Sequence, residues 1–90
     1  MILEIKVNKK FLKELAALPN KTRQKVEKIV FEEIPSIEKL NEIPNIRKLT
    51  GYKNFYRIRQ GQYRIGLKYD EGTLIFERVL HRKDIYRYLA

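Results

Sequence analysis

The stretch that most constrains the fold is YRIRQGQYRI, residues 56–65, in which two similar arms flank a central glycine. Tyr56 and Ile58 alternate with arginines in the first arm, and Tyr63 and Ile65 do so in the second. A period of two residues is that of a β-strand with one buried face, and Gln-Gly-Gln between the arms suits a tight turn. The stretch therefore predicts one β-hairpin rather than a repeat architecture, with its tyrosines and isoleucines directed at a core.

The same alternation predicts a strongly basic second face on this hairpin. Its members are Arg57, Arg59 and Arg64, joined by Lys68 farther along the second arm. Like charges on neighbouring strands repel, at a cost of about 0.2–1 kcal/mol for each directly opposed pair. One interpretation is a solvated basic face. The other is an anion site, because arginine binds phosphate through two parallel N–H bonds.

The chain before the hairpin predicts one strand followed by two helices. Apolar and charged residues alternate over 3–7, which indicates a half-buried strand. Asn8 can cap a helix over 9–18, and a second apolar stripe predicts a helix over 21–34 that Pro35 closes. Because the turn between them is short, we expect the two helices to form an antiparallel hairpin.

The remaining segments complete an α+β fold. Residues 36–50 are predicted to be a connector with a short helical turn, and residues 73–80 (TLIFERVL) a further strand with apolar residues on both faces. Asp84 can cap one final helical turn in the tail. The expected order is β-α-α-β-β-β, an N-terminal strand and helix hairpin packed on a small antiparallel sheet, with a short C-terminal helical tail.

Composition limits the class of protein. Ninety residues suit a single domain, 1–90, with one modest core. The chain has no cysteine and one histidine, so a disulfide framework, a thiolate site or a His-rich metal site is not expected, and neither is a cofactor. The first residues are apolar only at alternate positions, so they are not expected to form a signal peptide. No segment reaches the roughly 20 apolar residues of a membrane span. We therefore expect a soluble, cytoplasmic protein.

Positive charge is concentrated in the second half of the chain. The formal net charge is +9, and residues 47–90 carry eleven Lys or Arg against four Asp or Glu. Such a basic half suggests a polyanionic partner, of which nucleic acid is the commonest, although a basic surface can also serve solubility alone.

A second group of candidate residues follows the last predicted strand. His81, Arg82 and Tyr86 fall within six residues. If that strand lies beside the arginine hairpin, its end brings them to the rim of the basic face. Histidine titrates near neutral pH, and tyrosine can pack in a core or stack on an unpaired base. With no cluster of metal ligands, the candidate chemistry is metal-independent acid–base catalysis at a phosphate, where RNA supplies its own 2′-hydroxyl nucleophile.

These residues belong to motifs of a known family. The sequence resembles the RelE/ParE superfamily of bacterial toxins from toxin–antitoxin pairs over essentially its whole length. One motif is KLTGYKNFYRIRQGQYRIGLKYD, where such toxins have a K-L-x-G segment before two strands. The other is VLHRKDIYRYL, which is similar to their closing H-R-x-D-hydrophobic-Y element.

The resemblance implies a RelE-like fold and a ribosome-dependent messenger-RNA endonuclease, an mRNA interferase that inhibits translation. The positions that match the family's functional residues are Arg57, Arg59, Arg64, His81, Arg82 and Tyr86. Arg57 and Arg59 stand where the best-known branch has lysines. Because arginine hardly loses its proton, the role of base shifts towards His81 or Tyr86.

The implied partners are a cognate antitoxin, acidic and partly disordered, and the ribosome with its mRNA, whereas operator DNA would be met only through the toxin–antitoxin complex. No membrane partner is expected. The helix lysines would suit ribosomal RNA or form ordinary solvated faces: Lys9, Lys10, Lys13, Lys21, Lys25 and Lys28. Two alternatives remain, a ParE-like inhibitor of DNA gyrase without nuclease activity, and a degenerate member that only binds its antitoxin.

Overall fold

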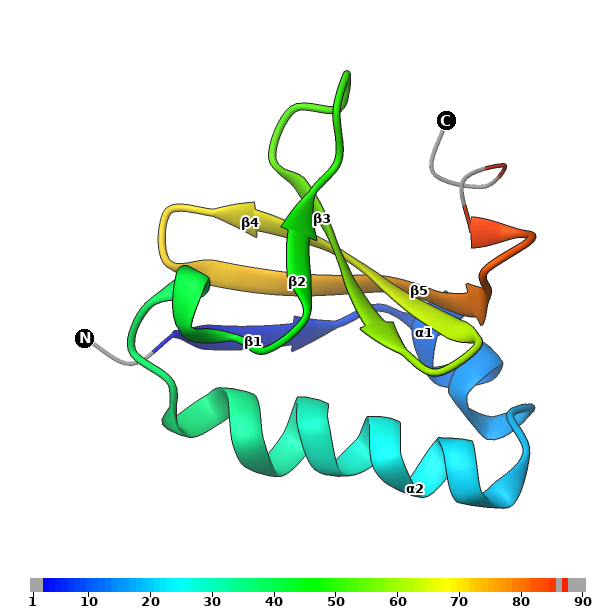
Figure 1. Cartoon of the computed structure of the whole chain (residues 1–90). Helices are drawn as coiled ribbons and strands as arrows, with labels where there is room; N and C mark the ends of the chain where they lie inside the picture. Colours follow the sequence, from blue (N-terminus) through cyan, green and yellow to red (C-terminus); the bar gives the residue numbers. More distant parts are fainter. Residues whose placement is uncertain (1–2, 86, 88–90) are drawn as a thin grey trace.

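The computed structural model describes residues 3–85 and residue 87 (Figure 1). Its strands are β1 (Glu4–Val7), β2 (Ile46–Lys48), β3 (Phe55–Gln60), β4 (Tyr63–Asp70) and β5 (Thr73–His81). Its helices are α1 (Lys9–Ala16) and α2 (Asn20–Lys28), and its shorter helical turns are η1 (Ile29–Glu33), η2 (Ile34–Ser36) and η3 (Leu40–Glu42). The predicted α+β class is confirmed. No helix among the described residues is long and apolar enough to cross a membrane.

The five strands form one sheet in the order β1-β5-β4-β3-β2. The β2–β3, β3–β4 and β4–β5 pairs are antiparallel, as expected for a meander, whereas β1 runs parallel to β5. The sheet is therefore mixed rather than wholly antiparallel. Parallel pairing of the first strand with the last needs a long crossover connection, and everything between β1 and β5 supplies it.

The second helix covers one face of the sheet. In Figure 1, α2 runs on through η1 and η2 as one rod beneath the strands. Its first turns are α-helical, and then the Ile34 N–H bonds to the Ile29 carbonyl, which makes η1 a π turn. Pro35 lies in the last turn, as expected for a residue that ends a helix. The helix predicted over 21–34 is thus confirmed.

The first helix packs on the sheet more than on the second helix. Its N-cap is Asn8, whose side-chain oxygen accepts the Phe11 N–H at 2.8 Å, as predicted. Farther along, Glu14 accepts both the Arg78 guanidinium, with Nε at 3.0 Å from each carboxylate oxygen, and the Val79 N–H at 3.1 Å. This carboxylate satisfies a backbone donor on β5 beyond the point where β1 ends.

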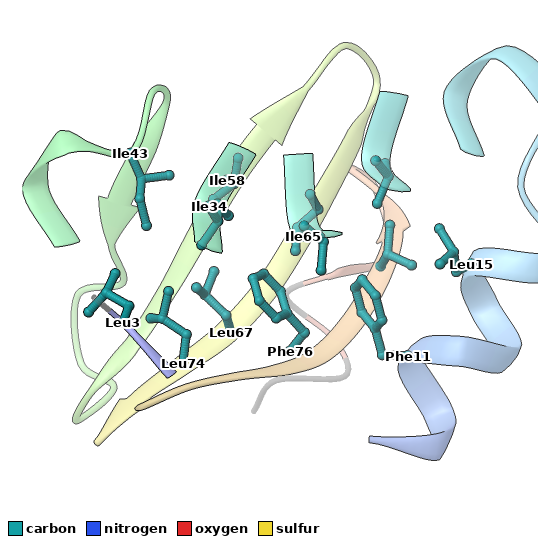
Figure 2. Packing of buried hydrophobic residues seen from close by; sticks show 13 residues of the cluster. Leu3, Phe11, Leu15, Ile34, Ile43, Ile58, Ile65, Leu67, Leu74 and Phe76 are labelled. Atoms are coloured by element: carbon teal, nitrogen blue, oxygen red, sulfur yellow. The ribbon is translucent and has the colours of Figure 1, made fainter. Parts of the chain in front are cut away.

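The core lies between the helices and the sheet (Figure 2). Phe11 of α1 meets Phe76 of β5 with ring centroids 5.6 Å apart, and Ile58 and Ile65 from the hairpin are buried beside them. Fully burying each such side chain stabilises the fold by about 1.5–3 kcal/mol. The tyrosine–isoleucine face of the hairpin is therefore directed at the core, as its alternation predicts.

Two features of the chain differ from the expectation or lie beyond the described residues. β2 occupies part of the segment predicted to be a connector, while η3 supplies the predicted short helical turn there. The predicted C-terminal helical turn includes residues 86 and 88–90, which lie outside the described residues. Residues 82–85, which follow β5 directly, lie on the side of the sheet opposite α2 (Figure 1).

Candidate functional site

The register of β3 and β4 places the hairpin arginines on the side of the sheet away from the helices, here called the arginine face. Ile58 pairs with Ile65 on the core side, and Arg59 pairs directly with Arg64 on the other. Arg57 lies opposite Gly66. The predicted sharing of one face by the three arginines is confirmed, and the Arg59–Arg64 pair carries the repulsion described above.

The turn between the strands directs Arg64. β3 ends at Gln60 and β4 begins at Tyr63, and Gly61 at the first position of the two-residue loop has a φ of 59°. A positive φ at Gly61 without one at Gln62 is typical of a type II′ turn, whose first position glycine adopts without steric cost. The Arg64 Nη1 donates to the Gly61 carbonyl at 2.8 Å and to the Tyr63 carbonyl at 3.0 Å. The turn thus holds the guanidinium at the end of the hairpin.

The end of β5 brings Arg82 to the same turn. β5 pairs with β4 along its length, and the Arg82 N–H donates to the Gln62 carbonyl at 2.8 Å just beyond the last pair. This bond ties the chain after β5 to the loop of the arginine hairpin. The expected neighbourhood of Arg82 and the hairpin is therefore present.

These residues line one concave surface of about 590 Å³, here called the arginine hollow. Its lining residues are Asn45, Arg59, Gln60, Gly61, Gln62, Arg64 and Arg82. Three are cationic, three carry side-chain amides, and none of the described lining residues is acidic. Guanidinium and amide N–H groups converging on a hollow suit a phosphate or another small anion.

Arg57 lies close to the hollow without lining it. Its Nη1 donates to the Asn45 carbonyl at 3.3 Å, and that carbonyl also accepts the Arg59 N–H at 3.2 Å. Asn45 itself has a φ of 62°, in the left-handed region that asparagine tolerates better than most residues. It thus links the two arginines of β3 through its backbone.

A bulge in β5 decides which residues of its end reach the arginine face. Leu67 pairs with Phe76 while Gly66 pairs with Arg78, so Glu77 has no counterpart on β4. Glu77 instead accepts the Asn8 Nδ2 at 2.6 Å. One extra residue shifts the alternation of every later side chain to the other face.

After the bulge, His81 falls on the core side of the sheet. It pairs with Tyr63, and the two rings meet edge-on with centroids 5.5 Å apart. The His81 Nδ1 accepts the Lys83 N–H at 3.2 Å, so the proton of the neutral ring lies on Nε2. His81 does not line the arginine hollow, although the next residue, Arg82, does. The other tail candidate, Tyr86, lies outside the described residues.

Three lining residues were not singled out from the sequence: Asn45, Gln60 and Gln62. The Pro44–Asn45 dipeptide is a turn signal that could have marked Asn45 as a residue of special backbone conformation. Gln60 and Gln62 belong to the predicted turn, but the alternating pattern of the hairpin gives no indication that they take part in binding.

Comparison with known proteins identifies the family of this chain. A family model described as the ParE toxin of the type II toxin–antitoxin system parDE matches residues 5–86, which include the whole arginine hollow. Toxin RelE3 of Methanocaldococcus jannaschii is 46% identical over 81 residues, covering 89% of this chain and 91% of the relative.

Solved structures agree with these sequence matches. A RelB–RelE antitoxin–toxin complex from Methanococcus jannaschii matches with a TM-score of 0.80 at 42% identity, covering 94% of this chain and 99% of the other. The RelBE2 complex from Mycobacterium tuberculosis matches with a TM-score of 0.72 at 21% identity, over 91% of this chain and 100% of the other, and so bears on the fold alone. The chain therefore belongs to the RelE/ParE superfamily of toxins from type II toxin–antitoxin systems.

Proposed function

We propose that this toxin is an endoribonuclease, an mRNA interferase that cleaves messenger RNA in the decoding site of a translating ribosome. The observation that carries the proposal is the arginine hollow, which Arg59, Arg64 and Arg82 line together. A concave set of guanidinium and amide groups, without a carboxylate among its described lining residues, suits the phosphodiester of an RNA strand. Cleavage in the cytoplasm would inhibit translation and arrest growth.

The proposed reaction uses the nucleophile that RNA carries. The ribose 2′-oxygen attacks the adjacent phosphorus, and the bond from phosphorus to the 5′-oxygen of the next nucleotide breaks. The products are a 2′,3′-cyclic phosphate and a free 5′-hydroxyl. One proton leaves the 2′-hydroxyl and one reaches the departing 5′-oxygen, so the reaction has no net uptake or release of protons and needs no cofactor. Negative charge grows on the phosphate oxygens in the transition state, where fixed cations stabilise it most.

The arginines take the electrostatic part of this reaction. Arg59 and Arg64 face each other across the hairpin and would hold the scissile phosphate, and Arg82 would assist from the end of β5. Arg57 lies next to them on β3 and would contact the neighbouring phosphate of the strand.

The two proton transfers need other groups, because a guanidinium stays protonated in proteins. We assign them to His81 and Tyr86. Protonated His81 would serve as the acid for the departing oxygen, but in the neutral ring Nδ1 already accepts the Lys83 N–H, and the ring lies against Tyr63 and outside the hollow. Because His81 lies outside the hollow, we assign the proton transfer at the 2′-hydroxyl to Tyr86. Tyr86 would also orient that hydroxyl or stack on a base.

The proposed partners follow from the same surface. An acidic, partly disordered antitoxin would neutralise a chain of net charge +9, and the related toxin structure from Methanococcus jannaschii is a complex with a RelB antitoxin. Operator DNA would be met through that toxin–antitoxin complex rather than by the toxin alone.

The test of this function is to express the chain with and without its neighbouring gene and to map messenger-RNA ends against translated codons. The proposal expects growth arrest and new ends at fixed positions within codons when the toxin is made alone. Growth arrest with intact messenger RNA would contradict the nuclease, and the absence of any toxicity would favour a degenerate member that only binds its antitoxin.

A second candidate function is inhibition of DNA gyrase, favoured by the match to a family model named for ParE. This function needs a binding surface for a topoisomerase and makes no use of an assembled phosphate site. A plasmid-supercoiling assay with purified toxin and gyrase separates the two candidates. Loss of supercoiling without RNA cleavage would select the ParE-like function.

A further inference from the structure

The basic surface of the protein continues from the arginine hollow to the edge of the sheet. Residues 43–69 contain seven Lys or Arg and no Asp or Glu, and they include all of β2 and β3 and most of β4. Away from the hollow, this set includes Arg47 and Lys48 of β2, Lys53 and Arg57. Because like charges on paired strands repel, so long a run without a carboxylate indicates a surface that meets an extended polyanion.

Arg47 and Arg57 form a second arginine pair on the arginine face. They pair directly across β2 and β3, as Arg59 and Arg64 do across β3 and β4. Directly paired side chains share a face, with Cβ atoms about 4.5–5.5 Å apart. Arg47 is exposed, and neither Arg47 nor Arg57 forms an ion pair with another described residue. The pair therefore offers two guanidinium groups to an anion that lies beside the hollow.

The spacing of the two arginine pairs suits successive phosphates of one strand. Arg57 and Arg59 are two residues apart on β3, which corresponds to about 6.6 Å along the strand. Successive phosphates of an extended single strand are separated by a similar distance. One strand can therefore set one phosphate in the hollow and the next between Arg47 and Arg57. Its following nucleotide would then reach the loop between β2 and β3, residues 49–54.

This loop carries a concave surface of about 430 Å³, here called the Tyr52 pocket. Its lining residues are Lys48, Leu49, Thr50, Gly51 and Tyr52. The Tyr52 ring is half-buried and meets the Phe55 ring edge-on, with centroids 6.4 Å apart. An aromatic ring beside a lysine and a hydroxyl suits an unpaired base, which stacks on the ring while the cation attracts its phosphate.

Backbone hydrogen bonds shape the loop before a ligand binds. The Leu49 N–H donates to the Phe55 carbonyl at 2.9 Å, and the Tyr69 N–H of β4 donates to the Asn54 carbonyl at 2.9 Å. Gly51 has a φ of 84°, a conformation that glycine adopts without steric cost. In Figure 1 the loop projects away from α2. A pocket that is formed in advance loses less conformational entropy when it binds.

We propose that the RNA strand runs from the arginine hollow along β3 and that Arg47 and Arg57 together hold the phosphate next to the scissile one. Beyond that phosphate, the Tyr52 pocket takes an unpaired base. The proposal rests on the proposed function and deepens it, since it assigns the course of the substrate across the toxin. Tyr52 contacts a base away from the reacting atoms, so it contributes to base preference rather than to the chemical step.

The test measures binding of a short single-stranded 2′-O-methyl RNA, which lacks the nucleophile, by fluorescence anisotropy. Matched strands each lack one base and keep every phosphate. Arg47→Ala removes half of the second arginine pair, and Tyr52→Leu removes the ring but keeps an apolar side chain next to Phe55. Tyr52→Phe keeps the ring. Lys21→Ala is the charge control, on the helix that covers the other face of the sheet. Thermal unfolding establishes first that each variant is folded.

The two changes should weaken RNA binding in different ways. Arg47→Ala lowers the magnitude of the slope of log K against log salt concentration by about 0.7, as expected for one lost phosphate contact to a single strand. Tyr52→Leu weakens binding about tenfold without changing that slope, because it removes stacking alone. Tyr52→Phe binds nearly as well as the unaltered toxin, and Lys21→Ala leaves both the affinity and the slope unchanged.

The strands that lack a base identify the contact with Tyr52. At one position, loss of the base weakens binding to the unaltered toxin about tenfold. Tyr52→Leu binds this strand and the intact strand equally, because the missing ring and the missing base are partners in one contact.

Other results would overturn the proposed course of the strand. Equal losses in Arg47→Ala and Lys21→Ala would mean that net charge alone attracts the RNA. A loss in Tyr52→Leu that is the same for every abasic strand would mean that the loop contacts no base. Unchanged RNA binding by Tyr52→Leu, together with weaker binding to ribosomes, would assign the pocket to a ribosomal protein.

Two results separate this proposal from the proposed function. RNA binding that depends on Arg47 and Tyr52, without cleavage on ribosomes, would support the course of the strand and contradict the nuclease. Cleavage by Arg47→Ala and Tyr52→Leu at the rate and the codon positions of the unaltered toxin would overturn the course of the strand and leave the nuclease in place.

Discussion

At the scale of single residues, the arginines of the hollow are anchored before any ligand arrives. Arg64 bonds to two carbonyls of its own turn, the Arg82 N–H bonds to Gln62, and the Arg59 N–H bonds to Asn45. Each bond restricts a backbone or side-chain group in advance, so that less conformational entropy is lost when a phosphate binds. Lower ordering cost leaves more of the interaction energy for the transition state.

Arg64 is the residue whose replacement tests the hollow most simply. Arg64→Ala should lower kcat for mRNA cleavage on ribosomes by about 10²–10³-fold, as loss of one fixed donor does in other enzymes. Arg64→Lys should lose about tenfold, because lysine keeps the charge but not the planar fork. Lys68→Ala is the control, since Lys68 lies on the same strand and face outside the hollow. Equal losses in Lys68→Ala and Arg64→Ala would refute a localised site.

His81 offers a test of how protons move. In His81→Asn the amide oxygen can still accept the Lys83 N–H, but the side chain no longer titrates. Because the ring lies outside the hollow, we expect cleavage to fall by less than about tenfold, and Tyr86→Phe to cost about 10²-fold or more. A pH–rate profile of both variants is the measurement. A fall of about 10²-fold in His81→Asn would instead identify His81 as the acid or base.

At the scale of elements, the hairpin and the end of β5 build the site together, and two irregularities position its side chains. The type II′ turn at Gly61 brings Arg64 to the end of the hairpin. The bulge at Glu77 shifts the alternation of β5, so that Arg82 lines the hollow and His81 faces Tyr63.

Gly61 in the β3–β4 turn and Gly72 in the β4–β5 turn provide a variant and its matched control. Gly61 and Gly72 have φ values of 59° and 86°, and a Cβ at either would meet nothing within 4 Å. Each change to alanine should therefore cost about 1 kcal/mol through backbone strain alone, measured by denaturant unfolding. Only Gly61→Ala should also lower cleavage, because its turn carries Arg64. Equal activity of the two variants would mean that the turn conformation does not matter to the site.

The hairpin could be predicted from the sequence because its pattern is local, whereas the remaining features depend on distant contacts. The two arms of residues 56–65 each alternate strictly, and the composition of both hairpin faces followed from that. β2 is only three residues long and shows no period of its own. Residues 73–80 are apolar on both faces, so nothing in them marks the bulge at Glu77 that puts Arg82 rather than His81 on the arginine face. Side-chain placement after a bulge needs the partner strand.

At the scale of the whole molecule, the fold separates its two tasks between the faces of one sheet. The helices and the core occupy one face, and the arginines of the hollow occupy the other. Pairing of β1 with β5 ties the N-terminus to the strand that delivers Arg82, although these strands lie far apart in the sequence. That pairing was not predictable from periodicity, because a pattern shows which face is buried but not which strand is the neighbour.

If the arginines of the hollow act on one phosphate, a double-mutant cycle of Arg59 and Arg64 will show it. The measurement is the single-turnover rate of mRNA cleavage on ribosomes for Arg59→Ala, Arg64→Ala and the double variant. If each single change lowers the rate about 10²-fold, the double variant should lose about 10³-fold rather than 10⁴-fold, because groups that act on one phosphate are not additive. Losses that multiply in full would mean that the two arginines act independently, and rates at the level of the unaltered toxin would mean that neither contacts the scissile phosphate.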